Sequence, residues 1–206
     1  MNKVKLATII AATALAGNSY AEFMLEEVIV TAQKREQSLQ DVPLSVAVIS
    51  SDALRRRNIN DIASLAQAAP SLNFQEGFGP TSTNFNIRGI ASYSFEGGIQ
   101  PSVSLVVDGV ASARNGEFVA ELSDIERVEV LRGPQGTLFG RNSTAGAINI
   151  VTQRPGEEFA GSAEVTVTDD DEQYYRLKVD GPLSDTVSAS LVAFHKDREG
   201  HIENIY

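Results

Sequence analysis

Hydrophobic and polar positions alternate over several short stretches between residues 42 and 156, and most of these stretches end at glycine or proline. Alternation of this kind, with many β-branched residues, predicts strands. The predicted strands cover residues 43–49, 85–88, 104–107, 127–132 and 147–152. Apolar residues at helical spacing predict two short helices, which begin at the capping residues Ser51 and Asn60. Residues 42–156 are therefore expected to form a compact α+β domain.

The last quarter of the chain, residues 157–206, has a longer and more regular alternation. Three segments of about ten residues each have one apolar and one polar face, and polar turns join them. Val192 and Phe194 interrupt the third segment, because they fall on its polar phase. The pattern is typical of the strands of a transmembrane β-barrel, and a water-soluble meander fits it equally well.

The first 21 residues have the pattern of a secretory signal peptide. Lys3 and Lys5 precede an uncharged run at residues 6–16, and the small residues Ser19 and Ala21 follow. The apolar run is too short to cross a hydrocarbon core of roughly 30 Å. We therefore expect cleavage after Ala21 and export of the remaining chain.

Residues 22–41 are polar apart from a β-prone island at Val28–Thr31. Residues 32–41 have no periodic apolar face, which favours a mobile linker. A short β-prone island in such an arm can pair with the sheet edge of another protein by strand addition. An ordinary edge strand of the following domain explains the same residues equally well.

Composition and charge exclude several classes of function. The chain has no cysteine, which rules out disulfides and thiolate chemistry, and its formal charge of −10 argues against nucleic-acid binding. Of its acidic side chains, 12 lie in residues 157–206 with only 4 basic ones. The only histidines are His195 and His201, and no nucleophile elbow or phosphate loop is present. We expect no enzymatic activity, no cofactor and no metal site.

Four stretches of the sequence resemble one family, the TonB-dependent outer-membrane receptors of Gram-negative bacteria. They are EEVIVTA at residues 26–32, NIRGI at 86–90, VVDGV at 106–110, and DIERVEVLRGPQGTLFGRNSTAGAINIVTQRP at 124–155. The resemblance implies a TonB-box arm and linker at 22–41, a plug domain at 42–156 and the start of a β-barrel at 157–206. The implied fold class is an α+β plug, a small mixed sheet with short helices, followed by the first antiparallel strands of a transmembrane β-barrel.

The same resemblance implies roles for individual residues. Arg88 and Arg132 resemble the arginines that hold the plug to the inner barrel wall, although either could instead bond within the plug. Aromatic side chains in two apical loops, Phe78, Tyr93 and Phe95, are candidates for contacting a ligand. The segment that resembles the TonB box, and is expected to bind TonB, comprises Glu27, Val28, Ile29, Val30, Thr31 and Ala32.

The implied function is energised uptake of a scarce nutrient, with a ferric siderophore as the default substrate. Cobalamin, haem or an oligosaccharide is an alternative substrate, and a periplasmic binding module formed by the plug alone is an alternative function. The implied partners are TonB with its inner-membrane energising complex, the outer membrane and a small-molecule ligand. The plug is expected inside the barrel with the TonB box facing the periplasm. Because three strands cannot close a barrel, we expect a truncated product or a fragment of a longer receptor.

Overall fold

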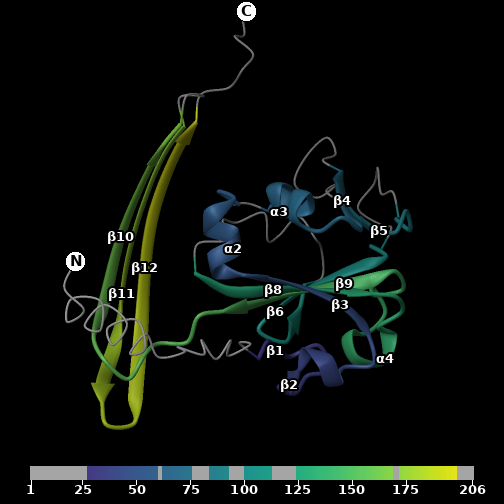
Figure 1. Ribbon diagram of the computed structural model, residues 1–206, viewed down its shortest axis with the longest axis horizontal. Helices are drawn as coiled ribbons and strands as arrows, with labels where there is room; N and C mark the ends of the chain where they lie inside the picture. Colours follow the sequence, from purple (N-terminus) through teal and green to yellow (C-terminus); the bar gives the residue numbers. More distant parts are fainter. Residues whose placement is uncertain are drawn as a thin grey trace, which may run out of the picture.

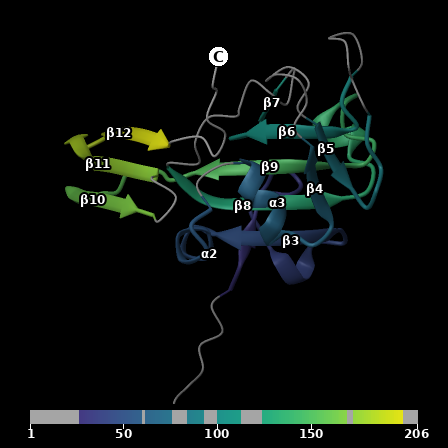
Figure 2. The ribbon, with the colours of Figure 1, turned by 90° about the horizontal axis from the view of Figure 1, so that it is seen from above.

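The computed structural model describes residues 27–59, 62–75, 84–92, 100–112, 124–168 and 172–198. The predicted signal peptide at 1–21 lies outside the described residues, and so do the candidate ligand residues Phe78, Tyr93 and Phe95. The described residues form four sheets, of which the two largest, a five-stranded sheet with helices and a three-stranded sheet of long strands, stand side by side (Figures 1 and 2).

The five-stranded sheet, which we call the plug sheet after the domain that the sequence resemblance implies, is the centre of the α+β domain expected at residues 42–156. Its strands, in spatial order, are β3 (Ser45–Ser50), β8 (Ile125–Arg132), β9 (Gly146–Thr152), β6 (Val103–Val107) and β7 (Val110–Ala111). The sheet is mixed, because β6 and β9 run parallel and the other neighbours antiparallel. This arrangement confirms the expected small mixed sheet. A separate hairpin pairs β4 (Leu72–Gln75) with β5 (Asn84–Ile87).

Among the described residues three short α-helices accompany the sheet: α2 (Ser51–Arg56), α3 (Ile62–Ala68) and α4 (Gly136–Phe139). The hydroxyl of Ser50 accepts a hydrogen bond from the backbone of Ala53 and caps α2, so the cap lies one residue before the predicted Ser51. The predicted cap of α3, Asn60, lies outside the described residues. No helix in the described ranges is long and apolar enough to cross a membrane.

The two faces of the plug sheet carry separate hydrophobic clusters. One cluster lies under α2, α3 and the β4–β5 hairpin, and includes Leu54, Leu65 and Phe85. The other includes Leu131 and Phe139, and the N-terminal segment of the chain covers it. Alternation along β8 and β9 sends successive side chains to opposite faces, so each strand contributes to both clusters.

The N-terminal segment folds as a small hairpin on the second face. Strand β1 (Ile29–Val30) pairs antiparallel with β2 (Gln37–Ser38), and the 3₁₀ helix η1 (Leu39–Asp41) follows. Val30, Ala32 and Val42 are buried against the sheet. The structure therefore corrects the expectation of a mobile linker at 32–41. Ala32, Leu39 and Val42 are too widely spaced to form a periodic apolar face in the sequence, and they still pack this segment against the second cluster.

The three long strands, β10 (Ala160–Val167), β11 (Glu172–Ser184) and β12 (Val187–Arg198), form an antiparallel sheet that we call the wall. The register aligns Leu177 with Ala163 and Ala193, so one face of the wall is apolar. On this face Leu191 is 74% exposed, whereas Tyr174 on the opposite face is buried. The predicted antiparallel strands with two unlike faces are confirmed.

Candidate functional site

The candidate site is a buried carboxylate under the N-terminal hairpin. Glu129 lies in β8 on the face that the hairpin covers, and it is fully buried. Its Oε1 accepts a hydrogen bond from the backbone nitrogen of Thr31 at 2.8 Å and from Thr31 Oγ1 at 3.1 Å. Hydrogen bonds to an ionised acceptor are roughly twice as strong as neutral ones. Thr31, which follows β1 directly, is therefore fastened to the centre of the plug sheet.

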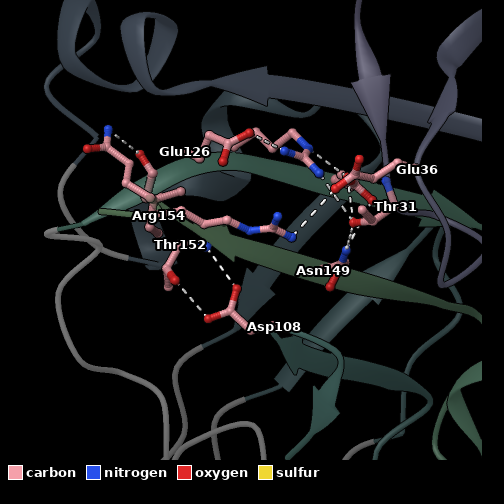
Figure 3. Close-up of polar contacts among 11 residues, drawn as sticks. Thr31, Glu36, Asp108, Glu126, Asn149, Thr152 and Arg154 are labelled. Carbon is pink, nitrogen blue, oxygen red and sulfur yellow. Dashed lines mark hydrogen bonds and ion pairs between the residues drawn. The ribbon is translucent and has the colours of Figure 1, made fainter. Parts of the chain in front are cut away.

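Two other side chains contact the same carboxylate. Arg127 Nε donates to Glu129 Oε1 at 2.8 Å, and Asn149 Nδ2 donates to Glu129 Oε2 at 3.0 Å. Asn149 Nδ2 also reaches Thr31 Oγ1 at 3.1 Å, and Figure 3 shows these two residues turned toward each other. Arg127 forms a second, more exposed ion pair with Glu126. Glu129 thus keeps a cation and an amide donor even when Thr31 is absent, and departure of the hairpin leaves no unpaired buried charge.

A pocket of about 600 Å³ opens beside this cluster, between the hairpin and the end of β9. At its rim Arg154 Nη2 lies 3.5 Å from Glu36 Oε1, and both side chains are exposed. Exposed pairs of this kind contribute about 0–1 kcal/mol. Lys34 lies over the ring of Phe139, 5.7 Å from its centroid. The turn of the hairpin is therefore held weakly, whereas Thr31 is held by charge-assisted bonds.

The VVDGV stretch supplies the opposite side of this pocket. Asp108 has a φ of 47° and Gly109 a φ of 82°, which gives the tight turn between β6 and β7. The Asp108 carboxylate accepts hydrogen bonds from the backbone nitrogen of Thr152 at 2.9 Å and from its hydroxyl at 2.8 Å (Figure 3). The turn is thereby fixed to the end of β9. The described residues contain no group of three or more His, Asp or Glu side chains suited to a metal ion.

Of the residues predicted to form the TonB box, only some pack against the plug. Val30 and Ala32 are buried in the plug, and Thr31 contacts Glu129. Val28 and Ile29, by contrast, are exposed. The set is therefore divided between side chains that dock on the plug and side chains that face solvent. Its binding to TonB stays a prediction.

The two predicted latch arginines lie near each other in the plug, and both contact Ser71. Arg132 Nε donates to Ser71 Oγ at 2.7 Å and its Nη1 donates to Ser45 Oγ at 3.2 Å. Arg88 has an exposed side chain, and its backbone nitrogen donates to Ser71 O at 3.0 Å. The contacts of Arg132 favour the alternative in which this arginine bonds within the plug.

A contact between the plug and the wall was missed by sequence reasoning. Lys178 of β11 is buried, and its Nζ lies 2.7 Å from Oδ1 of Asp124, the residue directly before β8. Arg176, on the same face of β11, lies 3.6 Å from the same oxygen. The sequence contains one indication of this contact. Arg176 and Lys178 are both cations on the polar face of a predicted barrel strand, the face that would point into the barrel.

Comparison with known proteins establishes the class to which the chain belongs. The family described as "TonB-dependent Receptor Plug Domain" matches residues 38–147, which is more than half of the chain. The chain therefore belongs to the TonB-dependent receptors. Its relatives are outer-membrane receptors and not enzymes, which confirms the expected class and the expected location, with the plug inside a barrel.

Individual relatives agree with this assignment. The "Iron-regulated outer membrane virulence protein" of Vibrio cholerae serotype O1 is 32% identical over an alignment of 192 residues that covers 88% of this chain and 29% of that protein. The "Pesticin receptor" of Yersinia pestis is 33% identical over 158 residues, which are 76% of this chain and 23% of that protein. The solved structure of the ferric yersiniabactin uptake receptor FyuA from Yersinia pestis matches with a TM-score of 0.67 and 31% identity, over 73% of this chain and 24% of that one. The chain thus spans less than a third of the length of these relatives.

Proposed function

We propose that this chain is the N-terminal part of a receptor that imports a scarce nutrient across the outer membrane with energy delivered by TonB. The observation that supports this most is the docked strand β1, whose neighbour Thr31 is fastened to the buried Glu129. In the described part of the chain β1 pairs with one strand only, β2, so a partner strand can add to its other edge.

In the proposed sequence of events the exposed and the buried residues of the predicted TonB box act one after the other. Val28 and Ile29 are exposed and offer the first contact to TonB. Force on this strand then separates Thr31 from Glu129, and Arg127 with Asn149 stabilises the carboxylate that remains. The buried side chains Val30 and Ala32 become available to TonB only after that separation. The docked hairpin thereby admits a first contact at the free edge of β1, and TonB reaches the buried side chains only when the plug is remodelled.

We propose a ferric siderophore as the substrate. The names of the relatives from Vibrio cholerae and Yersinia pestis, an iron-regulated protein and a ferric yersiniabactin uptake receptor, support this choice. The "Vitamin B12 transporter BtuB" of Photobacterium profundum is 27% identical over 181 residues, which keeps cobalamin as the alternative. Phe78, Tyr93 and Phe95 remain the proposed ligand-contacting residues of the plug, and Arg88 remains a proposed contact to the barrel.

The test uses the complete gene in its own host, grown without iron. Deletion of residues 28–32 is expected to abolish uptake of radioactive ferric siderophore and to leave its binding at the cell surface unchanged. Ile29→Pro should have the same effect, because proline cannot donate in a strand ladder, whereas Ile29→Val should retain uptake. A strain without TonB gives the reference for complete loss. Normal uptake after the deletion would contradict the role of this segment.

A further inference from the structure

One ammonium group from the wall joins two strands of the plug. Lys178 Nζ lies 2.7 Å from Asp124 Oδ1 and 2.6 Å from Gln153 Oε1. Asp124 directly precedes β8 and Gln153 directly follows β9, and these two strands are paired with Ile125 opposite Thr152. The side chain of Lys178 is only 8% exposed. A single buried cation therefore fixes the end of the β8–β9 pair to the wall.

The neighbouring inward positions of β11 strengthen this contact. Arg176 Nη2 lies 3.6 Å from Asp124 Oδ1, and its Nη1 lies 3.9 Å from Glu164 Oε2 on β10. Asp180 Oδ2 accepts a hydrogen bond of 3.1 Å from the backbone nitrogen of Gly156, in the connection between plug and wall. Alternate residues of one strand, 176, 178 and 180, thus contact the plug end or the connection that leads from it.

The contact of Lys178 with Asp124 and the contact of Thr31 with Glu129 differ in the partners that remain at the buried charge when the contact opens. Separation of Thr31 leaves Glu129 paired with Arg127 and Asn149. Separation of Lys178 from Asp124 leaves the ammonium with the neutral acceptor Gln153 Oε1 at 2.6 Å and, among the described residues, with the carboxylate of Asp180 at 4.0 Å. Removal of the partner of a buried charge is strongly unfavourable, whereas loss of a neutral donor is much less so. The hairpin contact is therefore suited to open and the wall contact to stay closed.

We infer that Lys178 and Asp124 form the fixed anchor between plug and wall in this receptor, and that they stay in contact during transport while β1 separates from the plug. The inference rests on the proposed transport function. It assigns the anchor to a cation of the wall and a carboxylate of the plug. Arg132, the arginine that resembles a latch residue, instead donates hydrogen bonds to Ser45 and Ser71 within the plug.

Reversible cross-linking distinguishes a contact that stays closed during transport from one that has to open. Residues 1–206 contain no cysteine, so the pairs Asp124→Cys with Lys178→Cys and Thr31→Cys with Asn149→Cys each place the only two cysteines in this part of the receptor. Each pair is placed in the complete gene and joined in whole cells with a short bis-methanethiosulfonate, which a reductant cleaves. The cross-linked anchor pair is expected to take up ligand within about twofold of the same cells after reduction. The cross-linked Thr31–Asn149 pair is expected to lose uptake more than tenfold and to regain it on reduction.

Two outcomes of this experiment would overturn the inference. In one, cross-linking of the anchor pair abolishes uptake and reduction restores it, which would mean that this contact must open. In the other, the cross-linked Thr31–Asn149 pair imports normally, which would mean that β1 does not separate. Absence of uptake in wild-type cells would instead contradict the proposed function, and the anchor would then be judged by a measurement that needs no transport.

That measurement is the permeability of the outer membrane to a large glycopeptide antibiotic, which a plugged barrel excludes. Lys178→Asp and Asp124→Lys are each expected to raise sensitivity several-fold, and the double variant with exchanged charges is expected to restore resistance. Lys196→Asp is the matched control, because this wall cation pairs with Glu172 on the neighbouring strand, 3.8 Å away. Surface labelling confirms equal amounts of each receptor. Single variants that resist like wild type, or a double variant no better than the singles, would show that the ion pair is not the anchor.

Discussion

At the scale of single residues, Glu129 shows how a polar position becomes the centre of a site. The alternation of the charged Arg127 and Glu129 with apolar residues in the sequence predicts a half-buried strand, on which the acid would face solvent. In the structure Glu129 is buried because Thr31, 98 residues earlier in the chain, lies over it. No local pattern contains that information, since the covering segment comes from the other end of the plug sequence.

The first residue-scale prediction concerns the charge of Glu129. In Glu129→Gln the acceptor for Thr31 becomes neutral, and the new amide group cannot accept from both Arg127 and Asn149. Hydrogen bonds to charged groups contribute about 1.5–3 kcal/mol, so exchange of the Thr31 amide hydrogen should accelerate by roughly tenfold to a hundredfold. Hydrogen exchange followed by mass spectrometry of the N-terminal peptide measures this rate.

The control for this experiment is Glu126→Gln. Glu126 pairs with the same arginine, Arg127, but its side chain is 47% exposed. Exposed ion pairs contribute about 0–1 kcal/mol, so exchange of the Thr31 amide should change by less than about fivefold. Equal acceleration in the two variants would show that the buried carboxylate has no special role in holding the hairpin.

At the scale of elements, the strands of the plug sheet were predictable and the N-terminal hairpin was not. The segments around Val46, Leu105, Val130 and Ile148 are β-branched runs bounded by turn residues, and each forms a strand near the predicted bounds. Strand β1 has only two residues, Ile29–Val30, and its stability comes from burial of Val30 and Ala32 on a distant sheet. A pattern as short as this does not distinguish a docked strand from an extended arm.

A prediction at this scale concerns Gly146, the first residue of β9. A β-carbon at this position would overlap the carbonyl oxygen of Leu131 and would lie 2.7 Å from Ile87 Cδ1. Because the overlap is with backbone of the paired strand β8, the sheet has to shift to relieve it. Gly146→Ala should therefore lower the free energy of unfolding by about 1–3 kcal/mol or more, as overpacking does. Thermal unfolding of the purified receptor measures the loss.

The matched control lies ten residues earlier, at Gly136. A β-carbon there meets no atom within 4 Å, and the residue is the first of α4. Gly136→Ala should leave stability unchanged or raise it by up to about 1 kcal/mol, because alanine is the better helix former. If the two alanine variants unfold at the same temperature, close approach of β8 and β9 does not explain the glycine at 146.

At the scale of the whole molecule, the wall has two faces with opposite environments. Lys178 and Tyr174 are buried on the face toward the plug, whereas Val165, Leu177 and Leu191 are exposed on the other. The alternation in the sequence predicts the two faces, but it does not predict which of them packs against the plug. The contacts of Lys178 with Asp124 and Gln153 identify the face that lies against the plug. These partners are 54 and 25 positions away from Lys178 in the sequence.

The last prediction tests whether the exposed face contacts lipid. Val165 is 64% exposed on the apolar face of β10, and the adjacent Thr166 points to the face shared with Tyr174, its register partner on β11. A lysine on the lipid side of a barrel strand is unfavourable by about 2–4 kcal/mol near the bilayer centre, and a lysine on the interior side is not. In the complete receptor Val165→Lys should therefore reduce the fraction that folds into lipid vesicles, whereas Thr166→Lys should fold like wild type. Gel mobility before and after heating measures that fraction, and equal folding of both variants would contradict the assignment of this face to the membrane.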